Sequence, residues 1–158
     1  MAEAFVADAM LGRLAKWMRF LGYDVLYFRD IDDRELVRIA RAEGRILLTR
    51  DRRLPEDFSV ECRLIGSEDL DEQLMEVLSE FPPPGSASRR CMRCNLLLEP
   101  VDKHGVKDFV PEYVFIHHDL FLRCPGCNRI YWEGSHIRNI VKRIAMIDRD
   151  VERSQESG

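Results

Sequence analysis

The chain contains, in its first half, the stretch Ile46-Leu47-Leu48-Thr49-Arg50-Asp51, in which an apolar run leads directly into two charged residues. Similar short runs lie at Phe5-Val6-Ala7 and at Val25-Leu26-Tyr27-Phe28. Continuous apolar runs of this length are typical of strands buried on both faces of a parallel sheet. A fourth run, at residues 60–65, alternates between apolar and polar side chains, as expected of an edge strand.

Amphipathic segments separate these runs. Apolar side chains recur at helical spacing in three sets: Met10, Leu11, Leu14, Trp17, Met18 and Leu21; Leu36, Ile39 and Ala40; Leu70, Leu74, Val77 and Leu78. Gly22 stands where a helix C-cap belongs, and Ser67 stands where the third helix would have its N-cap. Strands that alternate with amphipathic helices predict a small three-layer α/β domain with a parallel sheet over residues 1–80.

A proline-rich segment follows this domain. It contains Pro82-Pro83-Pro84-Gly85, which cannot continue a helix and has little side chain to bury. We interpret residues 81–89 as a linker to a second domain at residues 90–150, and we expect residues 151–158 to be a disordered tail. The second domain should end in a helix that Ser135 caps, with these apolar residues facing inward: Ile137, Ile140, Val141 and Ile144.

Two cysteine pairs dominate the second domain. They are Cys91-Met92-Arg93-Cys94 and Cys124-Pro125-Gly126-Cys127, with 29 residues between them. Two turns of this kind can complete a tetrahedral four-sulfur site, which suits zinc and is closed, as in structural sites. Disulfides or a redox motif are the alternatives. We expect a small Cys₄ zinc ribbon, with the cysteine ligands Cys91, Cys94, Cys124 and Cys127.

The composition restricts the setting of the protein. The 158-residue chain is 46% hydrophobic, which is enough for a real core, and no apolar run approaches the length of a membrane span. Reduced cysteines and the absence of a signal-peptide pattern near Met1 predict a cytoplasmic protein. The net charge of −4 combines −6 in residues 1–80 with +2 in residues 81–158. The chain is therefore not a polycation, and its oligomeric state cannot be read from these features.

Acidic residues follow the predicted strands. Asp8 ends the first strand, and Asp51 ends the third. Asp33 begins the helix after the second strand. Because sites in parallel sheets form beyond the carboxyl ends of the strands, these carboxylates would converge if the strands are neighbours. Several carboxylates in one place repel one another, and a hard cation such as Mg²⁺ or Mn²⁺ relieves that repulsion.

Other acids at this edge have structural interpretations beside functional ones. Asp32 lies three residues before Glu35, an arrangement that favours helix capping. Asp33 could complement the helix dipole. Asp30 could be an ordinary turn residue, and Asp57 could supply an outer ligand from the turn after the third strand. Asp30, Asp32 and Asp57 are therefore possible additional acids.

Basic residues near these acids could bind phosphate. Arg13 and Lys16 begin close to Asp8 on the first helix, and Arg50 lies beside Asp51. Four arginines form a stripe on the second helix: Arg34, Arg38, Arg41 and Arg45. Such stripes are often only solvated faces. In the ribbon, Tyr131 and Trp132 could stack on bases, although we expect them to seal its small core.

The segments Asp33–Ala40 and Gly44–Asp51 resemble those of PIN-domain nucleases, in which an acid opens a helix and a strand leads into a turn with a threonine and an aspartate. The opening segment, residues 6–24, and the ending Cys124–His136 resemble the PIN-like ribonuclease domain at the C-terminus of the Mut-seven exonucleases. That family carries a zinc ribbon after the nuclease-like domain. The resemblance covers residues 4–140.

The resemblance implies metal-dependent cleavage of RNA, with Asp8, Asp33 and Asp51 on the acidic positions of the family. We therefore expect an Mg²⁺- or Mn²⁺-dependent ribonuclease with a structural zinc ribbon that aids RNA binding. Arg13, Lys16, Arg50, Arg34 and Arg38 would contact substrate phosphates. The alternative function is a non-catalytic adaptor that binds RNA or ribosomes and retains a degenerate nuclease site.

Overall fold

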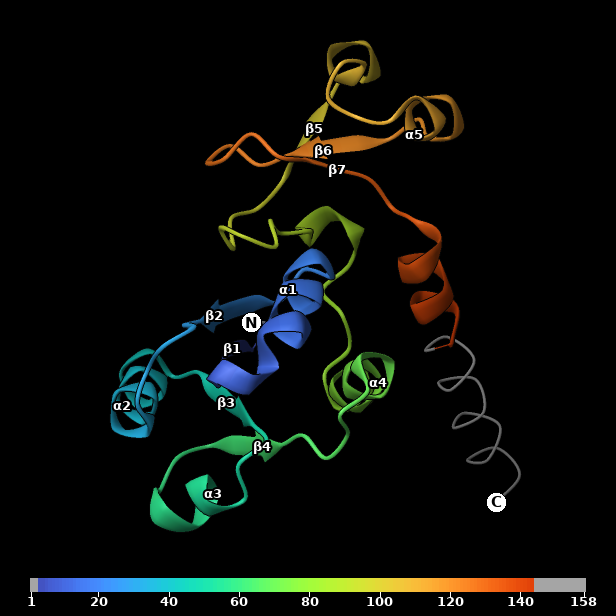
Figure 1. Ribbon diagram of the computed structural model, residues 1–158. Helices are drawn as coiled ribbons and strands as arrows, with labels where there is room; N and C mark the ends of the chain where they lie inside the picture. Colours follow the sequence, from blue (N-terminus) through green and yellow to red (C-terminus); the bar gives the residue numbers. More distant parts are fainter. Residues whose placement is uncertain (1–2, 144–158) are drawn as a thin grey trace, which may run out of the picture.

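A computed structural model of the protein describes residues 3–143, which form two sheets with their helices (Figure 1). The strands of the first sheet are β1 (Ala4–Ala7), β2 (Asp24–Tyr27), β3 (Ile46–Thr49) and β4 (Cys62–Leu64). The helices around it are α1 (Gly12–Phe20), α2 (Asp33–Glu43), α3 (Arg53–Asp57) and α4 (Leu70–Glu80). A short 3₁₀ turn, Ala9–Leu11, precedes α1. Within residues 3–143, no helix has the length and apolar character needed to cross a membrane.

The first sheet is parallel throughout, in the order β2-β1-β3-β4. Val6 of β1 pairs with Leu26 on one side and with Leu47 on the other. Leu48 of β3 pairs with Arg63 of the edge strand β4. The predicted α/β fold with a parallel sheet is thus confirmed, and the two most apolar strands occupy its centre.

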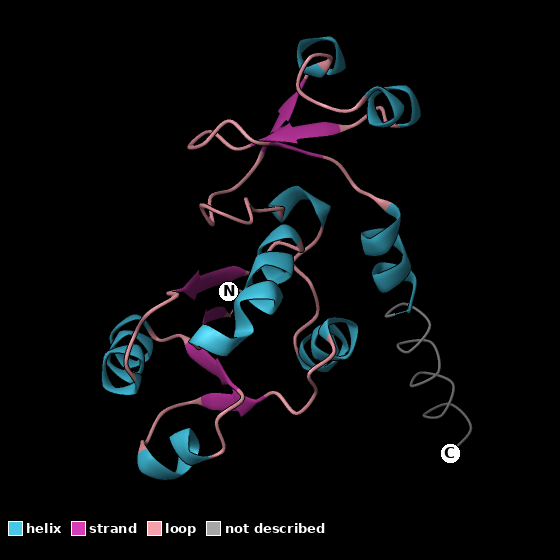
Figure 2. Cartoon of the chain, viewed as in Figure 1, coloured by secondary structure: helices cyan, strands magenta, loops and turns pink. Residues whose placement is uncertain are grey.

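Helices cover both faces of this sheet (Figure 2). Phe5, Ala7 and Leu48 face one side, where they share a core with the buried residues of α1 and α4. Val6 and Leu47 face the other side and pack with Leu36 and Val37 of α2 and Leu54 of α3. Alternate residues of one strand therefore enter different cores, which explains why β1 is apolar at every position and β3 at every position before Thr49.

The helix ends depend on local chemistry. The side chain of Asp32 caps α2 by accepting a hydrogen bond from the Glu35 amide (2.9 Å), as the sequence indicated. Gly44 ends α2 with a positive φ of 65°, a conformation that costs glycine little. The expected N-cap of α4 was wrong: Asp69 caps that helix, because its carboxylate reaches the Glu72 amide at 3.0 Å.

The second sheet is antiparallel and lies at the top of Figure 1. Its strands are β5 (Glu99–Val101), β6 (Phe121–Arg123) and β7 (Ile130–Tyr131). Between β5 and β6 lie a 3₁₀ segment, Lys103–Val106, and α5 (Glu112–His117). The chain is helical again at residues 135–143, beside α4, where His136 Nε2 lies 2.8 Å from Asp71 Oδ1.

The C-terminal helix differs in part from its prediction. Ile137 and Ile140 are buried as expected, whereas Val141 is 41% exposed, so its predicted inward position was wrong. Val141 lies on a side of the helix that the neighbouring elements do not cover. The predicted positions of Ile144 and of the tail at residues 151–158 lie outside the described residues.

One apolar core continues from the first sheet into the ribbon, and buried polar contacts reinforce the junction. Asn95, which follows Cys94, accepts a hydrogen bond from the Val25 amide (3.2 Å) and donates one to Asp24 Oδ1 (2.8 Å). Asp24 also pairs with Arg45 at 2.9 Å. Burial would raise the pKa of Asp24, but the hydrogen bonds from Arg45 and Asn95 lower it below its usual value. The junction is therefore specified by directional bonds as well as by apolar contact.

The two cysteine turns allow a matched test of this junction. Asn95 and Asn128 hold the same place after their turns, with φ values of 61° and 64°. Asn95→Ala and Asn128→Ala should therefore carry the same backbone strain, but Asn95→Ala also removes the bonds to β2. We expect Asn95→Ala to lower the free energy of unfolding by about 1–3 kcal/mol more than Asn128→Ala, measured by urea unfolding. Equal losses would show that these bonds do not stabilise the junction.

Candidate functional site

The carboxyl edge of the first sheet contains a topological switch point between β1 and β3. The chain that leaves β1 returns to β2 on one side, and the chain that leaves β3 returns to β4 on the other side. Loops that diverge in this way open a crevice in which parallel α/β sheets bind ligands. Asp8 follows β1 and Asp51 follows β3, so both lie at this crevice.

Asp8 is only 7% exposed, and hydrogen bonds hold its carboxylate in place. Its carboxylate accepts hydrogen bonds from the Thr49 hydroxyl (2.6 Å), the Arg50 amide (3.0 Å) and the Met10 amide (2.9 Å). Its own amide donates to the carbonyl of Leu48 at 2.9 Å. These bonds compensate the cost of burying a carboxylate and fix its position across β1 and β3.

Thr49 is a site residue that the sequence interpretation did not select. It is fully buried at the end of β3. Its hydroxyl donates to Asp8 Oδ2 and accepts a hydrogen bond from the Asp51 amide at 3.0 Å. Thr49 therefore links the two acids. A hydroxyl at the last position of an otherwise aliphatic strand was the available signal.

Asp51 also has a local structural role. Its Oδ1 accepts a hydrogen bond from the Arg53 amide at 2.9 Å, and its carbonyl accepts one from the Leu54 amide at 3.3 Å. These bonds organise the turn from which α3 begins. The sequence scan expected only a turn here, and the short helix α3 forms because Leu54 enters the core beneath it. The turn leaves Asp51 half-buried at the crevice.

Asp33 joins this group from the first residue of α2. Partial burial, followed by repulsion from Asp51, Asp8 and other nearby acids, raises the pKa of Asp33 above its usual value. Acids from two other segments therefore lie close enough to disfavour the charge of Asp33. A group that is destabilised by its neighbours in this way is often functional.

The remaining acids fall into different places. Asp32 and Asp57 contribute to the repulsion on Asp33, and Asp57 does so from the last residue of α3. Asp30 is exposed and is not among the acids that shift Asp33. The repulsion that Asp57 exerts on Asp33 therefore favours Asp57 over Asp30 as an additional acid. Asp24, at the opposite end of β2, is engaged by Arg45 and Asn95 and therefore has a structural role.

The acidic edge fits a hard cation better than a closed ligand cage. Within residues 3–143, the four cysteines are the set of metal-type ligands that converge to within 4.8 Å of one another, and no acidic trio converges as closely. Mg²⁺ keeps several of its waters and commonly binds through one or two carboxylates. Asp8, Asp33 and Asp51 could hold such an ion partly through water.

The predicted phosphate-binding residues differ in their availability. Arg13 and Lys16 are exposed on α1. On α2, Arg34 is exposed, and Arg38 pairs with Glu35 on the surface. The Arg50 guanidinium lies 3.8 Å from Glu68, and its Nε is buried without a hydrogen-bond partner within the described residues. The predicted four-arginine stripe was wrong at Arg45, which lies beyond the C-cap Gly44 and donates to Asp24. Within α2, Arg41 donates to the Ser59 carbonyl.

The four cysteines form the second candidate site. The two turns share one backbone geometry. The backbone amide of Asn95 donates to the Cys91 carbonyl and that of Asn128 donates to the Cys124 carbonyl, both at 2.9 Å. Their backbone amides also point at sulfur, with Cys94 N 3.3 Å from Cys91 Sγ and Gly126 N 3.4 Å from Cys124 Sγ. Four sulfurs within 4.8 Å of one another, supported by amides, could hold a zinc ion.

Tyr131 supports this cluster from β7. Its hydroxyl lies 3.1 Å from Cys91 Sγ and accepts a hydrogen bond from the Met92 amide at 3.0 Å, so its own proton is available to a deprotonated Cys91 sulfur. Burial alone would raise the pKa of Cys91, but the Tyr131 hydroxyl and nearby amides lower it to about 7. The ring of Tyr131 stacks on Phe20, with centroids 5.7 Å apart. Tyr131 thus packs against α1 at the junction with the first domain, and not only in the ribbon's own core as predicted.

Removing this hydroxyl should weaken metal binding. Groups that hydrogen-bond to metal ligands commonly contribute 10–100-fold in affinity, so we expect Tyr131→Phe to bind Zn²⁺ about tenfold or more weakly. Competition with a chromogenic chelator would measure this change. Tyr113→Phe, which alters an exposed tyrosine of α5, is the control. Unchanged zinc affinity in Tyr131→Phe would contradict a role for the hydroxyl at the metal.

Comparison with known proteins identifies the family of the chain. A search of curated proteins and a search of solved structures gave no match. A family model described as the Mut7-C RNAse domain matches residues 3–144, which include both the acidic edge and the cysteine cluster. The match covers nearly all of the chain. The chain therefore belongs to the Mut7-C RNAse domain family.

Proposed function

We propose that the protein hydrolyses RNA phosphodiester bonds at the carboxyl edge of its first sheet, with Mg²⁺ or Mn²⁺ bound by Asp8, Asp33 and Asp51. The observation that carries this proposal is the convergence of acids from three segments at the β1–β3 switch point, where partial burial and then repulsion by the neighbouring acids raise the pKa of Asp33. Membership of a ribonuclease-domain family supports RNA as the substrate.

Each acid has a distinct role in this proposal. Asp8 is the fixed ligand, because hydrogen bonds from Thr49 and Arg50 hold its carboxylate across two strands. Asp51 and Asp33 complete the negative site from the start of α3 and α2. A bound divalent cation would lower the pKa of an attacking water and stabilise the leaving oxygen. Asp57 is the additional acid that the geometry favours.

The substrate is held by cations around this edge. Arg13 and Lys16 project from α1 into solvent and can meet RNA phosphates. The buried Nε of Arg50 has no hydrogen-bond partner within the described residues, so a phosphate oxygen could complete its bonding. Zinc held by the four cysteines stabilises the ribbon, which would in turn position RNA beside the first domain.

One observation favours the alternative of a non-catalytic RNA-binding adaptor. Asp8 already accepts three hydrogen bonds, which is most of the capacity of a carboxylate, and it could be a purely structural link between β1 and β3. In that case RNA would bind through the arginines and the ribbon, and no divalent cation would bind at the acids.

The cleavage assay separates the two functions. With Mn²⁺ or Mg²⁺ and labelled single-stranded and structured RNAs, we expect Asp51→Asn to reduce the cleavage rate about 100-fold or more, because loss of a metal-bound carboxylate removes several kcal/mol of transition-state stabilisation. The control is Asp108→Asn, which makes the same charge change at an exposed residue between β5 and α5. Wild-type cleavage by Asp51→Asn would refute the assigned site, and RNA binding without cleavage by the wild-type protein would support the adaptor.

Thermal melting tests metal binding without reference to cleavage. Because the pKa of Asp33 is raised in the folded state, its charge destabilises the fold at neutral pH. In zinc-loaded protein without Mn²⁺, Asp33→Asn should melt above wild type at pH 7, and this difference should shrink as the pH falls and Asp33 becomes protonated.

Adding Mn²⁺ should reverse that order. Saturating Mn²⁺ stabilises a protein that binds it, by about 2.7 kcal/mol at 100 times the dissociation constant, so the melting temperature of wild type should rise. Asp33→Asn should lose most of this rise, whereas Asp108→Asn should keep it. An equal rise in all three proteins would place the Mn²⁺ elsewhere.

A further inference from the structure

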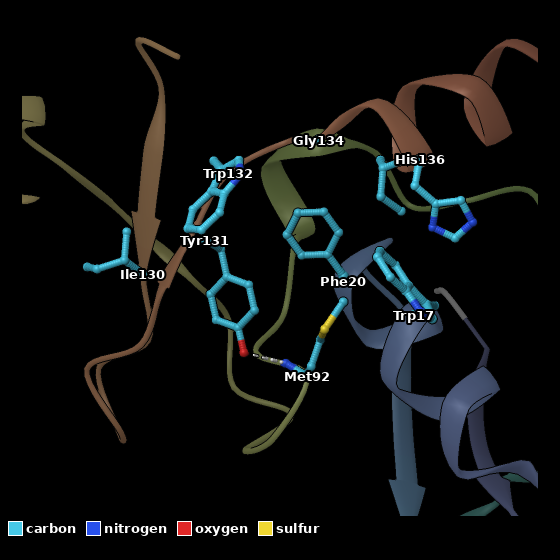
Figure 3. Close-up of a pocket in the computed structure, with 9 residues that line it drawn as sticks. Trp17, Phe20, Met92, Ile130, Tyr131, Trp132, Gly134 and His136 are labelled. Atoms are coloured by element: carbon cyan, nitrogen blue, oxygen red, sulfur yellow. Dashed lines mark hydrogen bonds between the residues drawn. The ribbon is translucent and has the colours of Figure 1, made fainter. Parts of the chain in front are cut away.

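A third site lies away from the acids, where the first domain meets the ribbon (Figure 3). A cavity of about 320 Å³ opens there between α1, the first cysteine turn, β7 and the C-terminal helix. The side chains that define it are Trp17, Phe20, Met92, Tyr131, Trp132 and His136. Four of these six are aromatic rings other than histidine, contributed by two distant parts of the chain.

The lining of the cavity is mostly apolar, and its accessible ring surface comes from Trp17, Tyr131 and Trp132. Phe20 offers little surface, because it is 2% exposed and its ring already stacks on Tyr131. In Figure 3, Trp132 stands on one side of the cavity, Trp17 stands on the other, and Phe20 lies between them. The Tyr131 hydroxyl is engaged by Cys91 and Met92, and His136 is engaged by Asp71. An occupant would therefore be recognised by flat apolar surface rather than by charge.

We propose that this cavity binds one unstacked base of single-stranded RNA. Proteins that bind single strands place bases on aromatic side chains, and each stacked base contributes substantially to affinity whatever its identity. A volume of about 320 Å³ lies at the lower end of the range for small-ligand sites, which suits a single base. This inference rests on the proposed function only in taking RNA as the ligand.

The position of the cavity connects it to the acidic edge. Helix α1 begins shortly after Asp8 and carries Arg13 and Lys16 on its exposed side before it reaches Trp17. The 3₁₀ turn Ala9–Leu11 joins Asp8 to α1, and from Gly12 to Trp17 the helix rises roughly 7.5 Å at 1.5 Å per residue, so a short single strand could reach both places. Cations would then meet its phosphates between the base in the cavity and the bond at the acids.

The wild-type protein provides a direct optical test. The chain has two tryptophans, Trp17 and Trp132, and both line the cavity, so tryptophan emission reports on this place. Without divalent cation, so that no cleavage occurs, octauridylate should quench the emission saturably. An octamer of abasic ribose phosphates, which keeps the charge but has no bases, should leave it unchanged. Equal quenching by the two octamers, or no quenching by either, would overturn the proposal.

Variants test the cavity by affinity. We expect Trp132→Leu, which keeps an apolar residue but removes a stacking surface, to weaken binding of fluorescein-labelled octauridylate by about fivefold or more. Tyr113→Leu removes an exposed aromatic ring of the ribbon far from the cavity and should bind as wild type does. Equal affinity of Trp132→Leu and wild type would overturn the proposal, as would an equal loss in both variants.

Gly134→Leu provides a second variant that does not depend on removing packed side chains. Gly134 lines the cavity, and a Cβ added there meets no atom within 4 Å, so a leucine can narrow the cavity while the core is retained. It should weaken octauridylate binding as Trp132→Leu does. Unchanged affinity in a folded Gly134→Leu protein, as judged by its melting temperature, would contradict the site.

Cleavage is measured separately, in wild-type protein with Mn²⁺. Selective quenching by octauridylate without any RNA cleavage would support the base site and refute the nuclease proposal. Cleavage that depends on Asp51, with no selective quenching, would refute the base site and leave the nuclease proposal intact. The two proposals therefore fail on different observations.

Discussion

The buried guanidinium of Arg19 is the contact on which the arrangement of the two halves depends. Its Nε donates to the Val25 carbonyl of β2 at 2.8 Å, and its Nη1 donates to the Met92 carbonyl of the first cysteine turn at 2.9 Å. Burial lowers the pKa of Arg19, but the guanidinium remains charged. Because a buried charge without hydrogen bonds is costly, the folded state depends on these bonds. Helix α1, the edge strand β2 and the ribbon are thereby joined through one side chain.

This contact joins metal binding to the sheet. Met92 and Asn95 belong to the first cysteine turn, and both contact groups of the first domain, through Arg19 and through Val25 and Asp24. The turn also covers one end of β2, a strand whose outer edge has no neighbour within the described sheet. Metal that organises the turn would therefore stabilise the edge of the nuclease-like domain as well. Because Trp17 and Phe20 flank Arg19 on α1, the same junction creates the aromatic cavity beneath β7.

The acidic edge combines fixed and unsatisfied charge. Asp8 is buried and anchored by three hydrogen bonds. Asp33 is more exposed, and partial burial together with repulsion from neighbouring acids raises its pKa. The hydrogen bonds fix the position of the Asp8 carboxylate. The repelled acid makes the edge less stable, and a bound cation would relieve that repulsion. The Thr49 hydroxyl connects Asp8 with Asp51, so a change at either strand end would be felt at both acids.

Local patterns in the sequence determined the four strands of the first sheet, most of the longer helices, the two cysteine turns and the ends of strands at which Asp8 and Asp51 lie, because burial and turn chemistry act over a few residues. They did not predict the short strands β5, β6 and β7 of the second sheet. The same reasoning missed α3 and α5, which are only a single turn or so long, and it misassigned the cap of α4 and the direction of Val141. The tertiary structure alone decided the order β2-β1-β3-β4, the proximity of Asp33 and Asp57, the link through Thr49, and the junction made by Arg19 and Asn95. These features join residues as much as 73 positions apart, and no local periodicity records which distant segments will become neighbours.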